Sequence, residues 1–110
     1  MKSIRELREN DARRLAERIA ADPTPAELEA AKRTMRQFYI FAARYQRSFY
    51  TEQDREATEA QKRAADQNSE NAYRRAAESL AKYRLKISTP GLYPIIEETN
   101  GANFTYGHWY

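Results

Sequence analysis

A seam of seven apolar residues is the feature that most constrains how this 110-residue chain can fold. Its members recur at alternating steps of three and four, the spacing that gathers side chains on one face of a helix: Leu28, Ala31, Met35, Phe38, Ala42, Tyr45 and Phe49. Such a face has to pack against another element. Thr24, Pro25 and Glu27 form a capping-box pattern just before it, so we predict a helix over residues 25–50.

Two further helices are predicted around this seam. Ser3 and Glu6 match a capping box, and the apolar stripe after them predicts a helix over residues 3–21 that ends at the sequence DPTP. Residues 52–87 contain neither Gly nor Pro, so a long third helix is predicted there. The Asn and Ser residues of DQNSEN favour a break in it near residues 66–71.

The third helix begins with alanines as its only apolar residues, which makes it a natural partner for the large side chains of the seam. We therefore expect residues 25–50 and 52–87 to form a long antiparallel hairpin that turns near Tyr50 and Thr51. In this register residues of the seam face alanines of the third helix: Phe49 faces Ala57, Ala42 faces Ala64, and Met35 faces Ala72. The shorter first helix is expected near the open end of the hairpin.

Residues 88–110 differ from the rest in their turn residues and aromatic content. The sequence STPG stops the third helix, and Asn100-Gly101 is a favoured pair for a tight turn, so we predict a small hairpin from Tyr93 to Tyr106 or an extended aromatic tail. The predicted fold class is mainly α, a three-helix bundle of one long helical hairpin and a shorter N-terminal helix, in a single domain of residues 1–110.

Composition indicates a soluble, cytoplasmic protein. The chain has no cysteine, its N-terminus is charged, and its longest apolar run, FYIFAA, is too short to cross a bilayer. We therefore expect no membrane partner.

The residue inventory argues against an enzyme. The chain holds a single histidine, His108, no cysteine nucleophile, and only three glycines, which lie too far apart to form a phosphate-binding loop: Gly91, Gly101 and Gly107. We expect no catalytic residue, no metal site, no cofactor and no small-molecule substrate.

Arginines on the side of the second helix opposite the seam, around Ile40, give one candidate surface. This surface would contact nucleic-acid phosphates through residues of both helices. Its members in the second helix are Arg33, Arg36, Arg44 and Arg47, and those in the third are Arg74, Arg75, Lys82 and Lys86. A solvated helix face would show the same pattern. The net charge of +3 is modest, and no known nucleic-acid-binding motif is present.

Aromatic residues outside the seam, together with neighbouring arginines, give a second candidate, a protein-binding surface at the hairpin tip and the C-terminal tail. Its members are Tyr39, Phe41, Arg44, Arg47, Tyr50, Phe104, Tyr106 and Trp109. The alternatives are that the tail covers the tip within one molecule, or that two copies associate through it.

We favour a protein partner over nucleic acid because the net charge is low and the third helix begins with acidic residues. We therefore expect a protein-binding module that acts as an adaptor, an assembly subunit or an inhibitor. A phage or mobile-element inhibitor of a host nucleic-acid-binding machine is one function within that class.

Overall fold

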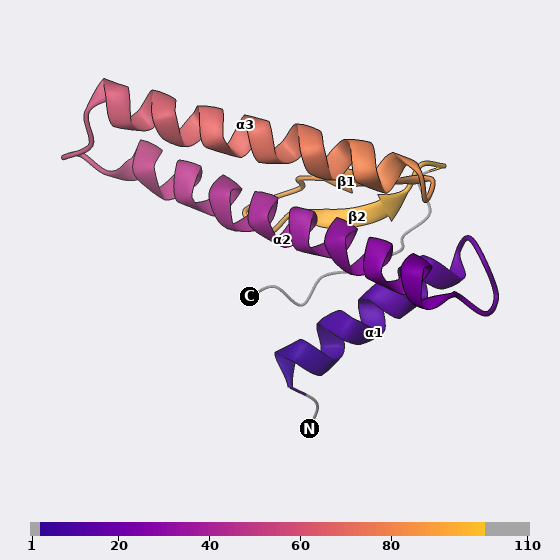
Figure 1. The fold of residues 1–110 in the computed structure, drawn as a ribbon. Helices are drawn as coiled ribbons and strands as arrows, with labels where there is room; N and C mark the ends of the chain where they lie inside the picture. Colours follow the sequence, from indigo (N-terminus) through magenta and orange to yellow (C-terminus); the bar gives the residue numbers. More distant parts are fainter. Residues whose placement is uncertain (1–2, 101–110) are drawn as a thin grey trace.

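A computed structural model of the chain describes residues 3–100. Three helices precede a two-stranded antiparallel hairpin (Figure 1), with these bounds: α1, Ile4–Glu17; α2, Pro25–Gln53; α3, Glu59–Ala81; β1, Leu85–Ser88; and β2, Ile95–Glu98. The predicted fold class is confirmed, since the long α2–α3 hairpin packs with α1 and is followed by a small β-hairpin.

Helices α1 and α2 begin at their predicted caps. The Ser3 hydroxyl accepts a hydrogen bond from the Glu6 N–H at 3.2 Å. Thr24 and Glu27 form the reciprocal capping box, in which the Glu27 carboxylate accepts from the Thr24 N–H at 2.9 Å. This bond lowers the pKa of Glu27.

The end of α1 comes about a turn earlier than the predicted residue 21. The N–H groups of Arg18 and Ile19 bond to carbonyls three residues back, Leu15 and Ala16, at 3.1 and 3.0 Å. This tighter pattern closes the helix ahead of DPTP.

The start of α3 differs from the predicted one. Helix α2 continues to Gln53, and α3 begins at Glu59 instead of residue 52. Thr51 and Asp54 have the spacing of a cap for a helix that starts at residue 52. Thr51 is not a cap, however, because its hydroxyl donates to the Arg47 carbonyl inside α2 at 2.7 Å. The cap is Thr58, which exchanges two hydrogen bonds with Gln61 in a full capping box at 2.8 and 3.1 Å.

The longer connection between the helices corrects the predicted register. Two side-chain hydrogen bonds cross the hairpin, from Ser79 to Gln37 and from Ser48 to Asp66. In this alignment Ala72 and Ala76 pack against Phe41, so Ala72 does not take the predicted place beside Met35. Large side chains still meet alanines, but at positions further along α3.

Helix α3 runs without interruption through residues 66–71, so the predicted break is wrong. The polar side chains there are used within the helix: the Gln67 amide donates to Asn71 one turn later at 2.9 Å, and Ser69 is buried. Helical neighbours four residues apart satisfy the groups that would otherwise favour a turn.

The predicted extension of α3 to residue 87 is also wrong. Arg84 adopts a left-handed conformation with φ of 60°, which ends the helical path, and residues 85–88 form β1. The strand pairs in register with β2, from Leu85 opposite Glu98 to Ser88 opposite Ile95. The hairpin therefore begins before the predicted Tyr93–Tyr106 segment and has only its second strand inside it. The part of that segment after Asn100 lies outside the described residues.

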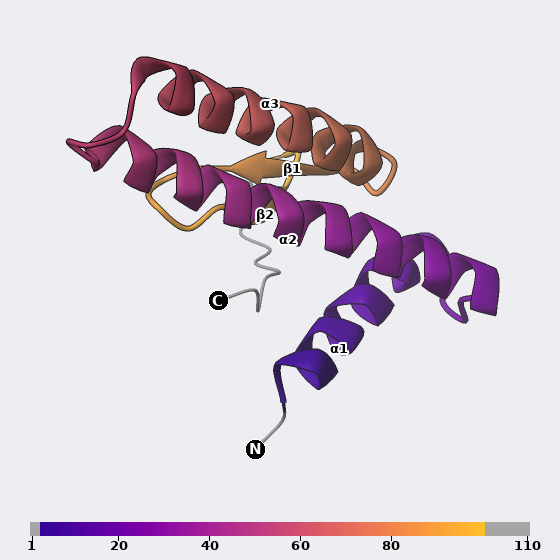
Figure 2. The ribbon, with the colours of Figure 1, turned by 60° about the vertical axis from the view of Figure 1, so that its left-hand side comes forward.

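The main core lies where α1, the α2–α3 hairpin and the β-hairpin meet. Leu15 of α1, Phe38 of α2, Leu80 of α3, and Leu85 and Ile96 of the strands share one buried cluster. In Figure 2, α1 diverges from α2 toward its own N-terminus, and the strands lie along one side of the α2–α3 pair. None of the helices in the described part is long and apolar enough to cross a membrane.

Candidate binding surface

The prediction that Phe41 belongs to an exposed surface at the hairpin tip is wrong, because Phe41 is a core residue. Its side chain is 2% exposed and packs with Ala72, Ala76 and Ile87. Tyr73 of α3 meets it edge-on, with ring centroids 5.4 Å apart. The buried face of α2 is wider than the seam because α3 and β1 cover adjacent parts of it.

Tyr39 belongs to the contact between α1 and α2 instead of the hairpin tip. The guanidinium of Arg8 lies 4.5 Å from the centroid of its ring, a cation–π contact. Within residues 3–100 its buried hydroxyl has no hydrogen-bond partner. Burial and the nearby Asp11 raise the pKa of Tyr39.

Phe49 and Tyr50 form the aromatic surface that does lie near the hairpin tip. Phe49 is 46% exposed and Tyr50 is 59% exposed, with ring centroids 5.6 Å apart in an edge-on pair. The expectation that Phe49 fills the seam is wrong. The described core clusters lie toward the other end of the hairpin, so the last turns of α2 have little to cover them.

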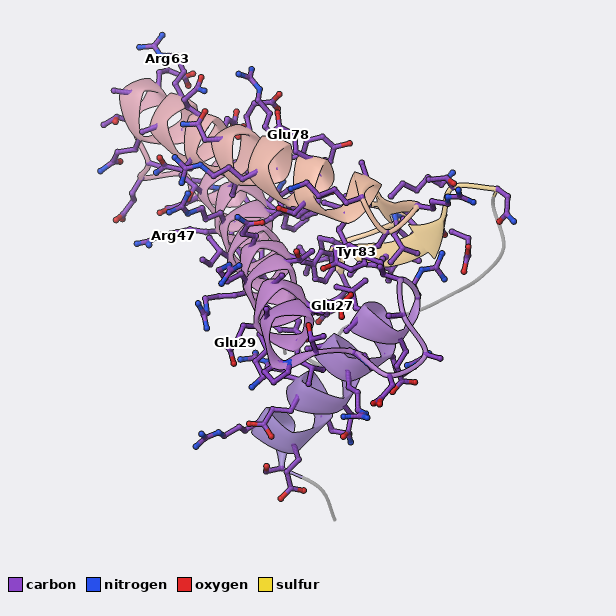
Figure 3. All side chains as sticks on the ribbon, turned by 45° about the vertical axis from the view of Figure 1, so that its right-hand side comes forward. Glu27, Glu29, Arg47, Arg63, Glu78 and Tyr83 are labelled. Atoms are coloured by element: carbon purple, nitrogen blue, oxygen red, sulfur yellow. The ribbon has the colours of Figure 1, made fainter. Side chains whose placement is uncertain are left out.

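The arginines of α2 lie on its exposed side, as their spacing predicts. Arg33, Arg36, Arg44 and Arg47 are exposed, and Ile40 between them is 43% exposed. Figure 3 shows Arg47 projecting away from the helical pair. Within the described part of the chain, no carboxylate forms an ion pair with these four arginines, whereas arginines of α1 and the outer side of α3 have such partners.

The cations of the predicted nucleic-acid surface do not form one continuous patch. Arg75 lines a hollow with Arg44, but Arg74 pairs with Glu70 at 3.7 Å. Lys82 caps α3 and lines a different depression beside Arg18 and Tyr83. Lys86 lies in β1, paired in register with Glu97.

A shallow groove follows the uncovered side of the α2–α3 hairpin. One hollow of about 110 Å³ is lined by Gln37, Ile40 and Arg44 of α2 and by Ala72 and Arg75 of α3. A second, of about 370 Å³, lies nearer the connection. Its lining holds one cation, one carboxylate, and small or polar side chains: Arg47, Asp54, Thr51, Ala57, Gln61, Ala64, Ala65 and Asn68. The sequence analysis placed Ala64 opposite Ala42 in the contact between the two helices, so it gave no sign that this alanine lines an open groove.

Three predicted members of the protein-binding surface, Phe104, Tyr106 and Trp109, lie outside the described residues, as does His108. Among residues 3–100, no group of three or more acidic or histidine side chains could hold a metal ion.

Comparisons with protein-family models, curated proteins and solved structures gave no match.

Proposed function

We propose that the chain is a non-enzymatic protein-binding module that recognises an acidic partner through the exposed side of α2. The observation that carries this proposal is that Arg33, Arg36, Arg44 and Arg47 have no ion-pair partner among the described residues. Such a row of cations attracts carboxylates and gives an association rate that depends on ionic strength.

Apolar groups beside the cations favour a protein over nucleic acid. Ile40 is exposed in the middle of the arginines, and Phe49 and Tyr50 are exposed near the tip. Protein interfaces combine such apolar and aromatic contacts with Arg, whereas phosphate contacts use charge and hydrogen bonds and need no apolar surface. An adaptor, an assembly subunit or an inhibitor would use this surface by occupying a site on another protein.

The test is affinity capture from an extract of the native host, with tagged full-length chain and nuclease treatment. The surface variant carries Gln in place of Arg33, Arg44 and Arg47. A matched control carries Gln in place of Arg13, Arg63 and Arg74, which removes the same charge from other exposed positions. We expect a nuclease-resistant partner that binds wild type and control but is lost from the surface variant.

Nucleic-acid binding is the second candidate, because the same unpaired arginines would also bind phosphates. It predicts that every captured partner disappears after nuclease treatment and that oligonucleotide affinity falls steeply with added salt. A protein partner captured equally by wild type and the surface variant would refute the proposed α2 surface.

A further inference from the structure

The groove on the uncovered side of α2–α3 has walls and a floor of different chemistry. Successive helical residues are about 100° apart, so Arg44 and Tyr45 lie on opposite sides of the line along which α2 contacts α3. Tyr45 and Ile87 of β1 both pack against the second buried cluster. The β-hairpin therefore covers one side of the seam, and the hollows lie on the other.

The floor of the groove is made of small side chains. Ala64 and Ala65 line the larger hollow, and Ala72 lines the smaller one. Alanine floors leave room for larger apolar side chains of a ligand to enter between two helices. Exposed Ile40 borders the smaller hollow and adds an apolar contact at its edge.

The walls of the smaller hollow are cationic on both sides, and the larger hollow has a cation on its α2 side only, with the carboxylate of Asp54 near the tip. Arg44 of α2 and Arg75 of α3 line the same hollow, and Arg47 lines the next one. In the described part of the chain none of these three arginines has an ion-pair partner. A ligand with carboxylates along both of its edges would satisfy both walls.

The shape of the groove fits a helix. From Gln37 to Thr51 the groove follows α2 for about 21 Å, which corresponds to a ligand helix of roughly 14 residues. A helix can present apolar side chains to the floor and acidic residues at steps of three and four to the two walls. A symmetric contact with a second copy would instead place these arginines against one another, which is unfavourable.

We infer that this groove binds an acidic amphipathic helix of a partner protein. The inference rests on the proposed protein-binding function and specifies the chemistry of the partner. The proposed function needs only the arginines of α2, whereas this inference also requires the partner to contact the alanines of the groove.

The test selects a display library of random peptides, roughly 16 residues long, on the immobilised full-length chain, followed by fluorescence anisotropy with the selected peptides. We expect them to be rich in Asp and Glu with apolar residues at helical spacing, and to become helical on binding. Ala64→Trp, which fills the larger hollow at an exposed position, should weaken binding at least tenfold. Ala81→Trp, at an exposed position outside the groove, is the matched control and should leave affinity unchanged.

Charge reversal gives a second, independent arm. Arg44→Glu with Arg75→Glu should abolish binding, and a peptide in which Lys replaces the acidic residues should restore it. Circular dichroism of each variant establishes that the helical fold is retained. Failure of the charge-swapped peptide to bind the folded variant would overturn the inference.

The outcomes separate this inference from the proposed function. If the host partner requires the arginines of α2 but binds Ala64→Trp as tightly as wild type, the proposed function stands and the groove inference is wrong. Selected peptides without acidic residues would also overturn it. So would a labelled oligonucleotide that displaces the peptides and binds Ala64→Trp and wild type equally, because the cations would then serve phosphates.

Discussion

Arg18, just beyond the end of α1, forms a two-pronged salt bridge with Glu98 of β2. The guanidinium nitrogens Nη1 and Nη2 lie 2.5 and 3.0 Å from the carboxylate oxygens Oε1 and Oε2. The Nε–H of the same arginine donates to the Tyr83 carbonyl at 2.9 Å. One side chain thus ties α1 to the turn after α3 and to the last strand, elements that are distant in sequence.

Glu98→Gln should make the protein less stable at neutral pH and remove part of its acid sensitivity. Arg18 lowers the pKa of Glu98 in the folded state, so the carboxylate stabilises the fold above its usual pKa of about 4.3. This contribution is lost as the pH falls through the lower, folded value. Urea midpoints at pH 7 and pH 3 measure the effect, and the difference between wild type and variant should shrink at pH 3.

The control for this prediction is Glu70→Gln, which removes a carboxylate from the exposed pair with Arg74. Exposed pairs contribute little to stability, so we expect a near-zero change. Equal effects of the two substitutions would show that the Arg18–Glu98 bridge does not hold the strands to α1.

Phe41→Ala should destabilise the protein strongly, whereas Phe49→Ala should not. Phe41 is fully buried between α2, α3 and β1, and its truncation leaves a cavity that costs about 3–5 kcal/mol. Phe49 is almost half exposed, so its truncation should change the free energy of unfolding by about 0.5 kcal/mol or less. Urea denaturation followed by circular dichroism measures both.

If Phe41→Ala fails to fold, the milder Phe41→Leu serves in its place and should still lower stability more than Phe49→Ala. Equal losses at the two positions would mean that Phe49 is also buried in solution, by another part of the chain or by a second copy. Measurement at several protein concentrations distinguishes these cases, since only the second depends on concentration.

Local spacing was sufficient to predict where α1 and α2 begin, but not the limits of α3. Phe38 and Ala42 are buried as their helical spacing requires. Thr51 and Thr58, by contrast, are each followed three residues later by a residue that can complete a cap. The choice between them depends on how Phe41 packs against Ala72, a contact between distant residues.

The strand β1 shows the same limit of local reasoning. Tyr83 and Ile87 are four residues apart and read as a helical stripe, while Leu85 and Ile87 are two apart and read as a strand. Residues 85–88 form a strand because they pair with residues 95–98. The exposed arginines of α2 followed from 100° spacing alone, but the groove beside them exists because the β-hairpin covers only one side of the helical pair.

Thr58→Ala should lower stability, and Thr51→Ala should have little effect. Thr58 forms both hydrogen bonds of the capping box at the start of α3, and loss of such a cap costs about 1 kcal/mol. Thr51 only bonds back to the Arg47 carbonyl within α2. Thermal unfolding of the two variants distinguishes them. A larger fall in melting temperature for Thr51→Ala than for Thr58→Ala would indicate that α3 begins at residue 52, as the sequence predicted.

Tyr39→Phe should leave the protein as stable as wild type at neutral pH and less sensitive to alkali. The buried hydroxyl has no hydrogen-bond partner within residues 3–100, so its removal costs little. Its pKa is raised by burial, then by Asp11, and the neutral phenol therefore stabilises the fold below pH of about 10. That contribution falls as the pH rises through the higher, folded value.

Alkaline titration of the tyrosinate absorbance checks this assignment. Wild type, with eight tyrosines, should show a late fraction that the Tyr39→Phe variant lacks. Arg8→Gln should delay ionisation of Tyr39 further, because the guanidinium over the ring favours the anion. If Tyr39→Phe instead destabilises the protein at pH 7 by as much as a lost buried hydrogen bond, about 1 kcal/mol, the hydroxyl has a partner in solution, and the contact between α1 and α2 includes a further polar group.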